Sequence, residues 1–105
     1  MMRDSVLSLV GIAKKANRVA SGGFQTETAV KSGKASLVII SRDASENTKK
    51  KFQNMCSFYQ VPACLYGTRE ELGAASGSQY KAVLAVQDSG FARAIEKKLA
   101  EGKPE

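Results

Sequence analysis

The feature that most constrains the fold is the run at 35–40, which is apolar except for Ser36 and ends in Leu-Val-Ile-Ile. Residues typical of turns lie on both sides of this run, and apolar and polar positions do not alternate within its second half. Such a strand is typical of a sheet that is covered on both faces. A second apolar run, at 82–86, has the same strand character. The sheet therefore needs helices on both of its faces.

Segments with apolar residues at helical spacing lie before, between and after these strands. Helices are predicted at 5–16, 25–32, 44–59, 69–75 and 89–99. Four positions carry the residues of a helix cap: Asp4, Asp88, Asp43 with Glu46, and Thr68 with Glu71.

Short strands at 18–21 and 63–66 complete an alternation of helices and strands without repeats or linkers. This alternation predicts one α/β domain over residues 1–105, with a mostly parallel or mixed sheet of about four strands between helices. Residues 101–105 are expected to be frayed.

In sheets of this kind, the loops that follow the strands gather at one edge, where ligands bind. The loops of this type are 22–23, 41–43, 67–68 and the segment after residue 86. In a mixed sheet the loop 77–81 would join the same edge. Gly73 and Gly77 are interpreted as a helix end and a turn.

The first of these loops contains the candidate binding site. Gly22 and Gly23 permit positive φ and the close approach of a ligand. Gln25, Thr26 and Thr28 follow at the point where a helix leaves its first N–H groups unpaired, and the helix dipole favours a phosphate there. The alternative is an ordinary strand-to-helix connection with no ligand.

Basic residues outnumber acidic ones by 16 to 10, and the resulting net charge of +6 is typical of a nucleic-acid binder. Groups that suit phosphates or base edges form the candidate site: Lys14, Lys15, Arg18, Gly22, Gly23, Gln25, Thr26, Lys31, Lys34, Arg42 and Gln79. Tyr80 could stack on a splayed base or cover core surface instead. The lysines at 49–51 are interpreted as a solvated helix face.

The sequence contains no histidine, which removes the commonest general base and metal ligand. Cys56 and Cys64 lack a second cysteine pair and are interpreted as core residues. Residues 33–35 do not complete a phosphate-binding P-loop, and the carboxylate pairs fit helix caps better than acid–base groups. We therefore expect no enzyme, cofactor, metal or small-molecule substrate. Because no apolar run is long enough for a membrane span, a cytoplasmic protein is expected. We also expect it to be monomeric.

Several segments, taken in order, resemble the kink-turn-binding ribosomal protein superfamily, and within it the YlxQ-like bacterial branch. These segments are 22–40, 42–44, Cys56 with 59–62, 71–75 and 85–86. The resemblance implies a three-layer α/β/α sandwich with a four-stranded mixed sheet. It also implies binding to kink-turn RNA, a sharply bent element with tandem sheared G·A pairs.

The resemblance further implies which residues contact RNA. In relatives, a Gly-x-Asn-Glu-x-x-Lys pattern at the start of the second helix reads guanines of the G·A pairs. Gly22 and Gln25 match the glycine and the acidic or amide position, while Phe24 and Thr28 stand at the asparagine and lysine positions. The relatives' apolar loop around flipped-out nucleotides corresponds to 77–81, which is more polar here.

The leading hypothesis is a non-catalytic RNA-binding protein, associated with ribosomal or other structured RNA. The runner-up is a protein–protein or regulatory module on the same fold, which the residues Phe24 and Thr28 favour. An RNA-modifying enzyme ranks last, because 105 residues leave no room for a cofactor domain.

Overall fold

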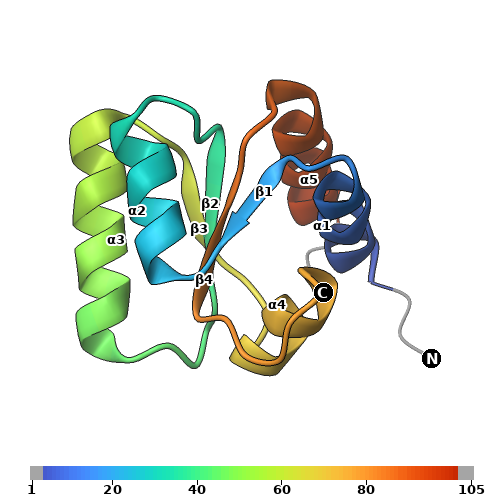
Figure 1. Cartoon of the computed structure of the whole chain (residues 1–105), viewed down its shortest axis with the longest axis horizontal. Coiled ribbons are helices and arrows are strands. Elements are labelled where there is room, and N and C mark those ends of the chain that lie inside the picture. The colour runs from blue at the N-terminus through green and yellow to red at the C-terminus, as the bar shows by residue number, and fades with distance from the viewer. Residues whose placement is uncertain (1–3, 102–105) are drawn as a thin grey trace.

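The structure is a computed structural model and describes residues 4–101 (Figure 1). Within this range, helices and strands alternate as the sequence predicts, and the predicted bounds hold to within two residues. The elements are α1 (Ser5–Lys15), β1 (Val19–Ser21), α2 (Gly23–Lys31), β2 (Leu37–Ile40), α3 (Glu46–Tyr59), β3 (Ala63–Leu65), α4 (Arg69–Ala75), β4 (Val83–Val86) and α5 (Ser89–Glu101).

The four strands form one mixed sheet in the order β1-β4-β2-β3. β4 is antiparallel to both of its neighbours, with Ala85 paired to Ala20 on β1 and to Val38 on β2. β2 and β3 are parallel. Every residue of the two central strands is buried, as the apolar runs predict.

Helices cover both faces of this sheet, which confirms the predicted three-layer α/β/α sandwich (Figure 1). Successive residues of β2 point to opposite faces because the side-chain period of a strand is two. Val38 and Ile40 pack in a core with residues of α2 and α3. Leu37 and Ile39 pack in a second core with residues of α1, α4 and α5.

Most of the predicted helix caps are confirmed by hydrogen bonds. The side chains of Asp4, Thr68 and Asp88 accept from the backbone N–H groups of Leu7, Glu71 and Phe91, at 2.9, 3.1 and 2.9 Å. These bonds satisfy N–H groups that the first helical turn leaves unpaired.

The capping box predicted from Asp43 to Glu46 is wrong. Ser45 caps α3 instead, and its hydroxyl accepts from the N–H of Thr48 at 3.1 Å. Asp43 accepts from the N–H of Arg69 at 2.9 Å, so it caps the start of α4, which lies 26 residues away in the sequence. The spacing of an acidic pair along one segment cannot reveal such a distant partner.

Cys56 is buried and Cys64 is partly buried, and both are free thiols. Burial raises the pKa of both thiols, to about 11 for Cys64, as expected for core residues. Residue 101, the first of the expected frayed tail, is the last residue of α5, and 102–105 lie outside the described residues. Between residues 4 and 101, no helix is long and apolar enough to cross a membrane.

Gly73 lies in the last turn of α4, as its interpretation as a helix end implies, but close packing also requires a glycine there. The backbone after Gly77 folds back against it. A Cβ at Gly73 would lie 2.2 Å from the carbonyl oxygen of Gln79, and the N–H of Ser78 donates to the Gly73 carbonyl at 2.7 Å. Only glycine lets residues 78–80 lie directly on the helix.

We predict that Gly73→Ala lowers the free energy of unfolding by about 1 to 3 kcal/mol or more. The reason is that the new methyl group overlaps backbone that cannot rotate away. Gly11→Ala is the matched control within α1, where a Cβ would lie 3.7 Å from its nearest neighbour, an ordinary contact. That control should leave stability unchanged or raise it by up to about 1 kcal/mol. Urea denaturation measures both values, and equal effects of the two substitutions would contradict the account.

Candidate functional site

One edge of the sheet collects the loops that carry the candidate site. β1, β2 and β3 run in the same direction and β4 runs in the opposite one, so the ends of the first three meet the start of β4. The N–H of Gly22 donates to the carbonyl of Val83 at 2.9 Å, and that of Ser41 to Ala82 at 2.8 Å. We call this edge, made of residues 22–25, 41–43, 66–69 and 79–82, the corner edge.

The loop that ends in Lys81 therefore joins this edge, as predicted for a mixed sheet. The prediction that the segment after Val86 also lies there is wrong. Because β4 is antiparallel, that segment leaves the opposite edge of the sheet, where the N–H of Gln87 donates to the Arg18 carbonyl at 2.8 Å.

The glycine turn gives the corner edge an uncapped helix start. Gly22 has φ 95° and ψ 162°, in the region that favours glycine, and it is the N-cap of α2 without a side-chain hydrogen bond. The first helical bond runs from the N–H of Thr26 to the Gly22 carbonyl at 2.9 Å. The N–H groups of Gly23, Phe24 and Gln25 therefore have no acceptor within the helix and suit an anion.

Lys81 is the cation nearest to this turn, and it is not among the predicted site residues. A Cβ at Gly22 would lie 3.6 Å from the Nζ atom of Lys81. The backbone N–H of Lys81 donates to the Arg69 carbonyl at 3.0 Å, which holds the loop in place. Among residues 4–101, Lys81 takes part in no ion pair. It is the only cation in the loop 77–81, and this is the signal that could have identified it.

The side chains after the glycine turn divide into exposed and buried ones. Phe24 is 83% exposed, and Gln25 and Thr28 are exposed as well. Thr26 is completely buried, and its hydroxyl donates to the carbonyl of Ala20 at 3.4 Å. The prediction that Thr26 presents its side chain to a ligand is therefore corrected: Thr26 joins α2 to β1.

Lys31 is engaged in an ion pair. Its Nζ lies 2.8 Å from a carboxylate oxygen of Glu27, and the other oxygen of Glu27 lies 3.3 Å from Nζ of Lys51 on α3. Hydrogen bonds from Lys31 and then Lys51 hold the pKa of Glu27 below its usual value, and the bond to Glu27 raises the pKa of Lys31. This cluster neutralises much of the charge expected from Lys31.

The other predicted cations are not gathered at the corner edge. Arg18 lies just before β1, four residues before Gly22, which is about 13 Å along an extended chain. Figure 1 shows that the end of α1 and the segment before β2 lie at the same far edge of the sheet. The structure thus separates from the glycine turn a group of predicted cations: Lys14, Lys15, Arg18, Lys31 and Lys34.

Arg42 remains at the corner edge and is held there by two contacts. Its N–H donates to the carbonyl of Gly67 at 2.7 Å, and its guanidinium carbon lies 5.5 Å from the ring centroid of Tyr66. Such cation–π packing orients the guanidinium and leaves its N–H groups able to bind an anion.

Gln79 and Tyr80 are the part of the corner edge that lies against α4. They line a hollow of about 340 Å³ together with Glu70, Ala74 and Ser78. Tyr80 is 66% exposed, so most of its side chain remains accessible rather than covering the core.

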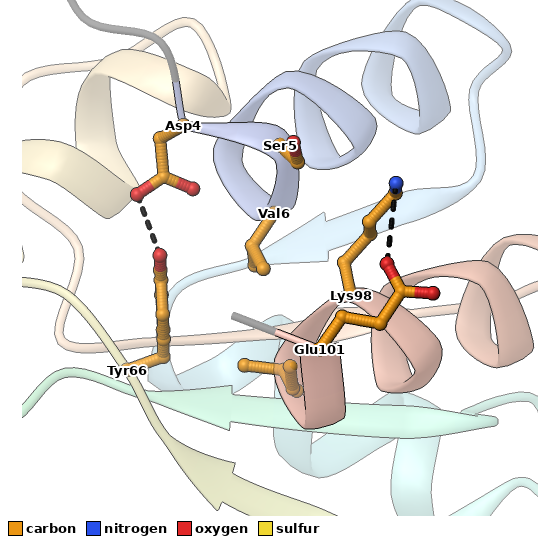
Figure 2. A pocket seen from close by; sticks show the side chains of 7 residues that line it. Asp4, Ser5, Val6, Tyr66, Lys98 and Glu101 are labelled. Carbon is orange, nitrogen blue, oxygen red and sulfur yellow. Dashed lines mark hydrogen bonds and ion pairs between the residues drawn. The ribbon is translucent and has the colours of Figure 1, made fainter. Parts of the chain in front are cut away.

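A separate pocket of about 400 Å³ lies between α1, α5 and Tyr66 (Figure 2). In Figure 2 the hydroxyl of Tyr66 points at Asp4, to which it donates at 2.6 Å. Burial, and then this hydrogen bond, raises the pKa of Tyr66 to about 12. Lys98 and Glu101 line the same pocket as an ion pair at 3.5 Å. These polar groups already satisfy one another, so the pocket presents no reactive side chain.

The described part of the chain offers no set of side chains that could bind a metal ion. No group of three or more His, Cys, Asp or Glu residues there is placed to hold a metal ion. The described site therefore consists of backbone N–H groups, cations and exposed side chains at the start of a helix. The structure defines the protein as a three-layer α/β/α sandwich that carries such a surface at one edge of a mixed sheet.

The chain belongs to the Ribosomal protein L7Ae/L30e/S12e/Gadd45 family, whose model matches residues 4–96. This match confirms the family resemblance drawn from the sequence. The curated relatives also support the YlxQ-like branch. The RNA-binding protein YlxQ of Bacillus subtilis (strain 168) is 37% identical over 87 residues, which cover 83% of this chain and 87% of that protein.

Two further proteins are similar over almost the whole chain. The RNA-binding protein YlxQ of Enterococcus faecium is 35% identical over 100 residues, which cover 95% of each chain. A solved structure of a protein with unknown function from Bacillus halodurans C is 38% identical, with a TM-score of 0.89, and the match covers 93% of this chain and 99% of that chain.

Proposed function

We propose that this protein is a non-catalytic RNA-binding protein whose corner edge contacts structured RNA of the kink-turn type, in ribosomal or other RNA. The observation that carries the proposal is the uncapped start of α2 at Gly22, with the Nζ atom of Lys81 beside it. Relatives that are named RNA-binding proteins support the same function.

The chemistry of the corner edge suits a bent nucleic-acid backbone. The N–H groups of residues 23–25 and the positive end of the α2 dipole favour a phosphate, and Lys81 adds a full positive charge. Gln25 is exposed at the same turn, and its amide can donate to and accept from base edges. Phosphate contacts would position the RNA, and Gln25 would contribute to its selection.

The cations at the far edge are proposed to attract RNA but not to select it. Lys14, Lys15, Arg18 and Lys34 are exposed and form no ion pair within residues 4–101. We infer that they attract RNA through phosphates outside the kink, without selecting its sequence.

The proposal is tested by comparing two RNAs at one moderate salt concentration. One is a kink-turn, and the other is the same stem with its G·A pairs changed to Watson–Crick pairs. We expect a large preference for the kink-turn, because only the bent form brings phosphates and guanine edges to the corner edge together. Equal micromolar affinity for both would contradict the proposal and favour the alternative, a protein–protein or regulatory module.

We predict that Lys81→Ala weakens kink-turn binding and reduces the slope of log K against log salt by about one. The physical reason is the loss of one phosphate contact and of its counterion release. Lys34→Ala removes the same charge at the far edge and is the matched control, with a smaller expected effect. Salt titrations of both variants measure the slopes. Identical losses would mean that net charge alone attracts the RNA.

A further inference from the structure

Phe24 is an exposed aromatic residue that belongs to neither hydrophobic core of the fold. It is the second residue of α2, and 83% of it is exposed, the highest value among the exposed large hydrophobic residues in the described range. The buried side of α2 consists of Thr26, Ala29 and Val30. Phe24 shares the opposite side with Thr28, one turn later, so its ring points away from the sheet.

The start of α2 is fixed without any contribution from this ring. A Cβ at Gly23 would lie 3.9 Å from the ring of Phe52, which is buried on α3. Thr26 is buried and bonds to the Ala20 carbonyl. These contacts leave Phe24 on a firmly held turn, which is the condition for a rigid contact surface.

The surroundings of Phe24 are positive. The N–H groups of residues 23–25 begin α2, and Lys81 lies beside Gly22. The nearest acidic side chain on α2, that of Glu27, is paired with Lys31 and Lys51. A ligand that covers the ring must therefore combine a flat apolar face with negative charge nearby, and a nucleotide has both.

Phe24 has no hydrogen-bonding group in its side chain, so it cannot read a base edge. Its favourable contact with RNA is stacking, which needs a base that has left its own helix. We propose that Phe24 is the stacking platform for one unpaired nucleobase of the bound RNA, whose phosphate lies against the first N–H groups of α2 and Lys81. This inference rests on the proposed function and adds a subsite to it.

Phe58 provides a matched control on the same protein. It is 78% exposed, close to the value for Phe24, but it lies near the C-terminal end of α3. Its ring packs edge-on against Tyr59 with a centroid separation of 5.0 Å. Phe58 therefore tests whether any exposed aromatic ring on this protein assists RNA binding.

The experiment measures the affinity of wild-type protein, Phe24→Ala, Phe24→Trp and Phe58→Ala for a kink-turn RNA and for the same RNA with an abasic site at its unpaired nucleotide. Phe24→Ala should weaken binding to the intact RNA by about five- to 150-fold, the range for loss of one base–aromatic stack. Phe24→Trp should keep the affinity, and Phe58→Ala should change it less than twofold. Phe24→Ala should lose little further affinity for the abasic RNA.

A second readout follows the base itself. With 2-aminopurine at the unpaired position, wild-type protein should quench its fluorescence by stacking, and Phe24→Ala should not. Unchanged urea unfolding of Phe24→Ala is expected, because the ring is exposed.

The outcomes separate this inference from the proposed function. If Phe24→Ala binds as wild type while the protein still prefers the kink-turn over the Watson–Crick stem, the stacking subsite is refuted and the proposed function stands. If Phe24→Ala and Phe58→Ala weaken binding equally, the site-specific role of Phe24 is refuted. If wild-type protein does not distinguish the two stems, the proposed function fails and the stacking subsite fails with it.

Discussion

The direction of β4 is the constraint on which the rest of the structure depends. This strand lies between β1 and β2, antiparallel to both, and all four of its residues are buried. The carbonyls of Ala82 and Val83 accept hydrogen bonds from Ser41 and Gly22 at its start. A parallel β4 would place the loop that ends in Lys81 at the far edge, and the glycine turn would lose its nearest cation.

Around this arrangement, contacts between distant residues hold the loops of the corner edge. Asp43 caps α4 through Arg69, and an oxygen of its carboxylate lies 3.5 Å from the guanidinium Nε of the same residue. Exposed ion pairs of this kind add little stability by themselves, but the backbone hydrogen bond fixes the position of the loop. The corner edge is thus a rigid surface composed of several short loops.

Tyr66 extends this support toward α1. Its ring lies under the guanidinium of Arg42, and its hydroxyl donates to Asp4, the residue that caps α1. One side chain therefore joins the corner edge to α1, across the pocket that Figure 2 shows. An aromatic ring between a cation and a carboxylate satisfies both partners without a buried charge.

The sequence permits a good prediction of the elements and a weaker one of the site. Apolar runs and helical spacing identify every helix and strand, because each depends on neighbours in the chain. Strand direction does not follow from those patterns, so the position of the segment after Val86 was predicted wrongly. The partner of Asp43 and the position of Lys81 depend on contacts across the sheet, and the packing that requires Gly73 depends on the backbone of Gln79.

The same limitation explains why most of the predicted cations do not lie at the glycine turn. Lys14, Arg18 and Lys34 are near the glycine turn in the sequence, but the length of β1 separates the first two from it and the length of α2 separates Lys34. Phe24 and Gln25 belong to the turn itself, and local structure is sufficient to place them at the surface. Within the turn, Phe24 and Gln25 are exposed as predicted but Thr26 is buried, and the cations beyond β1 or α2 do not reach the turn.

The central claim is that RNA docks on the corner edge, and backbone amide chemical shifts measured by NMR during titration with a kink-turn RNA test it most directly. The account predicts that the largest changes occur at residues 22–26 and 79–82, which surround the uncapped start of α2. The largest changes at residues 14–18, 34 and 87, with the glycine turn unaffected, would contradict it.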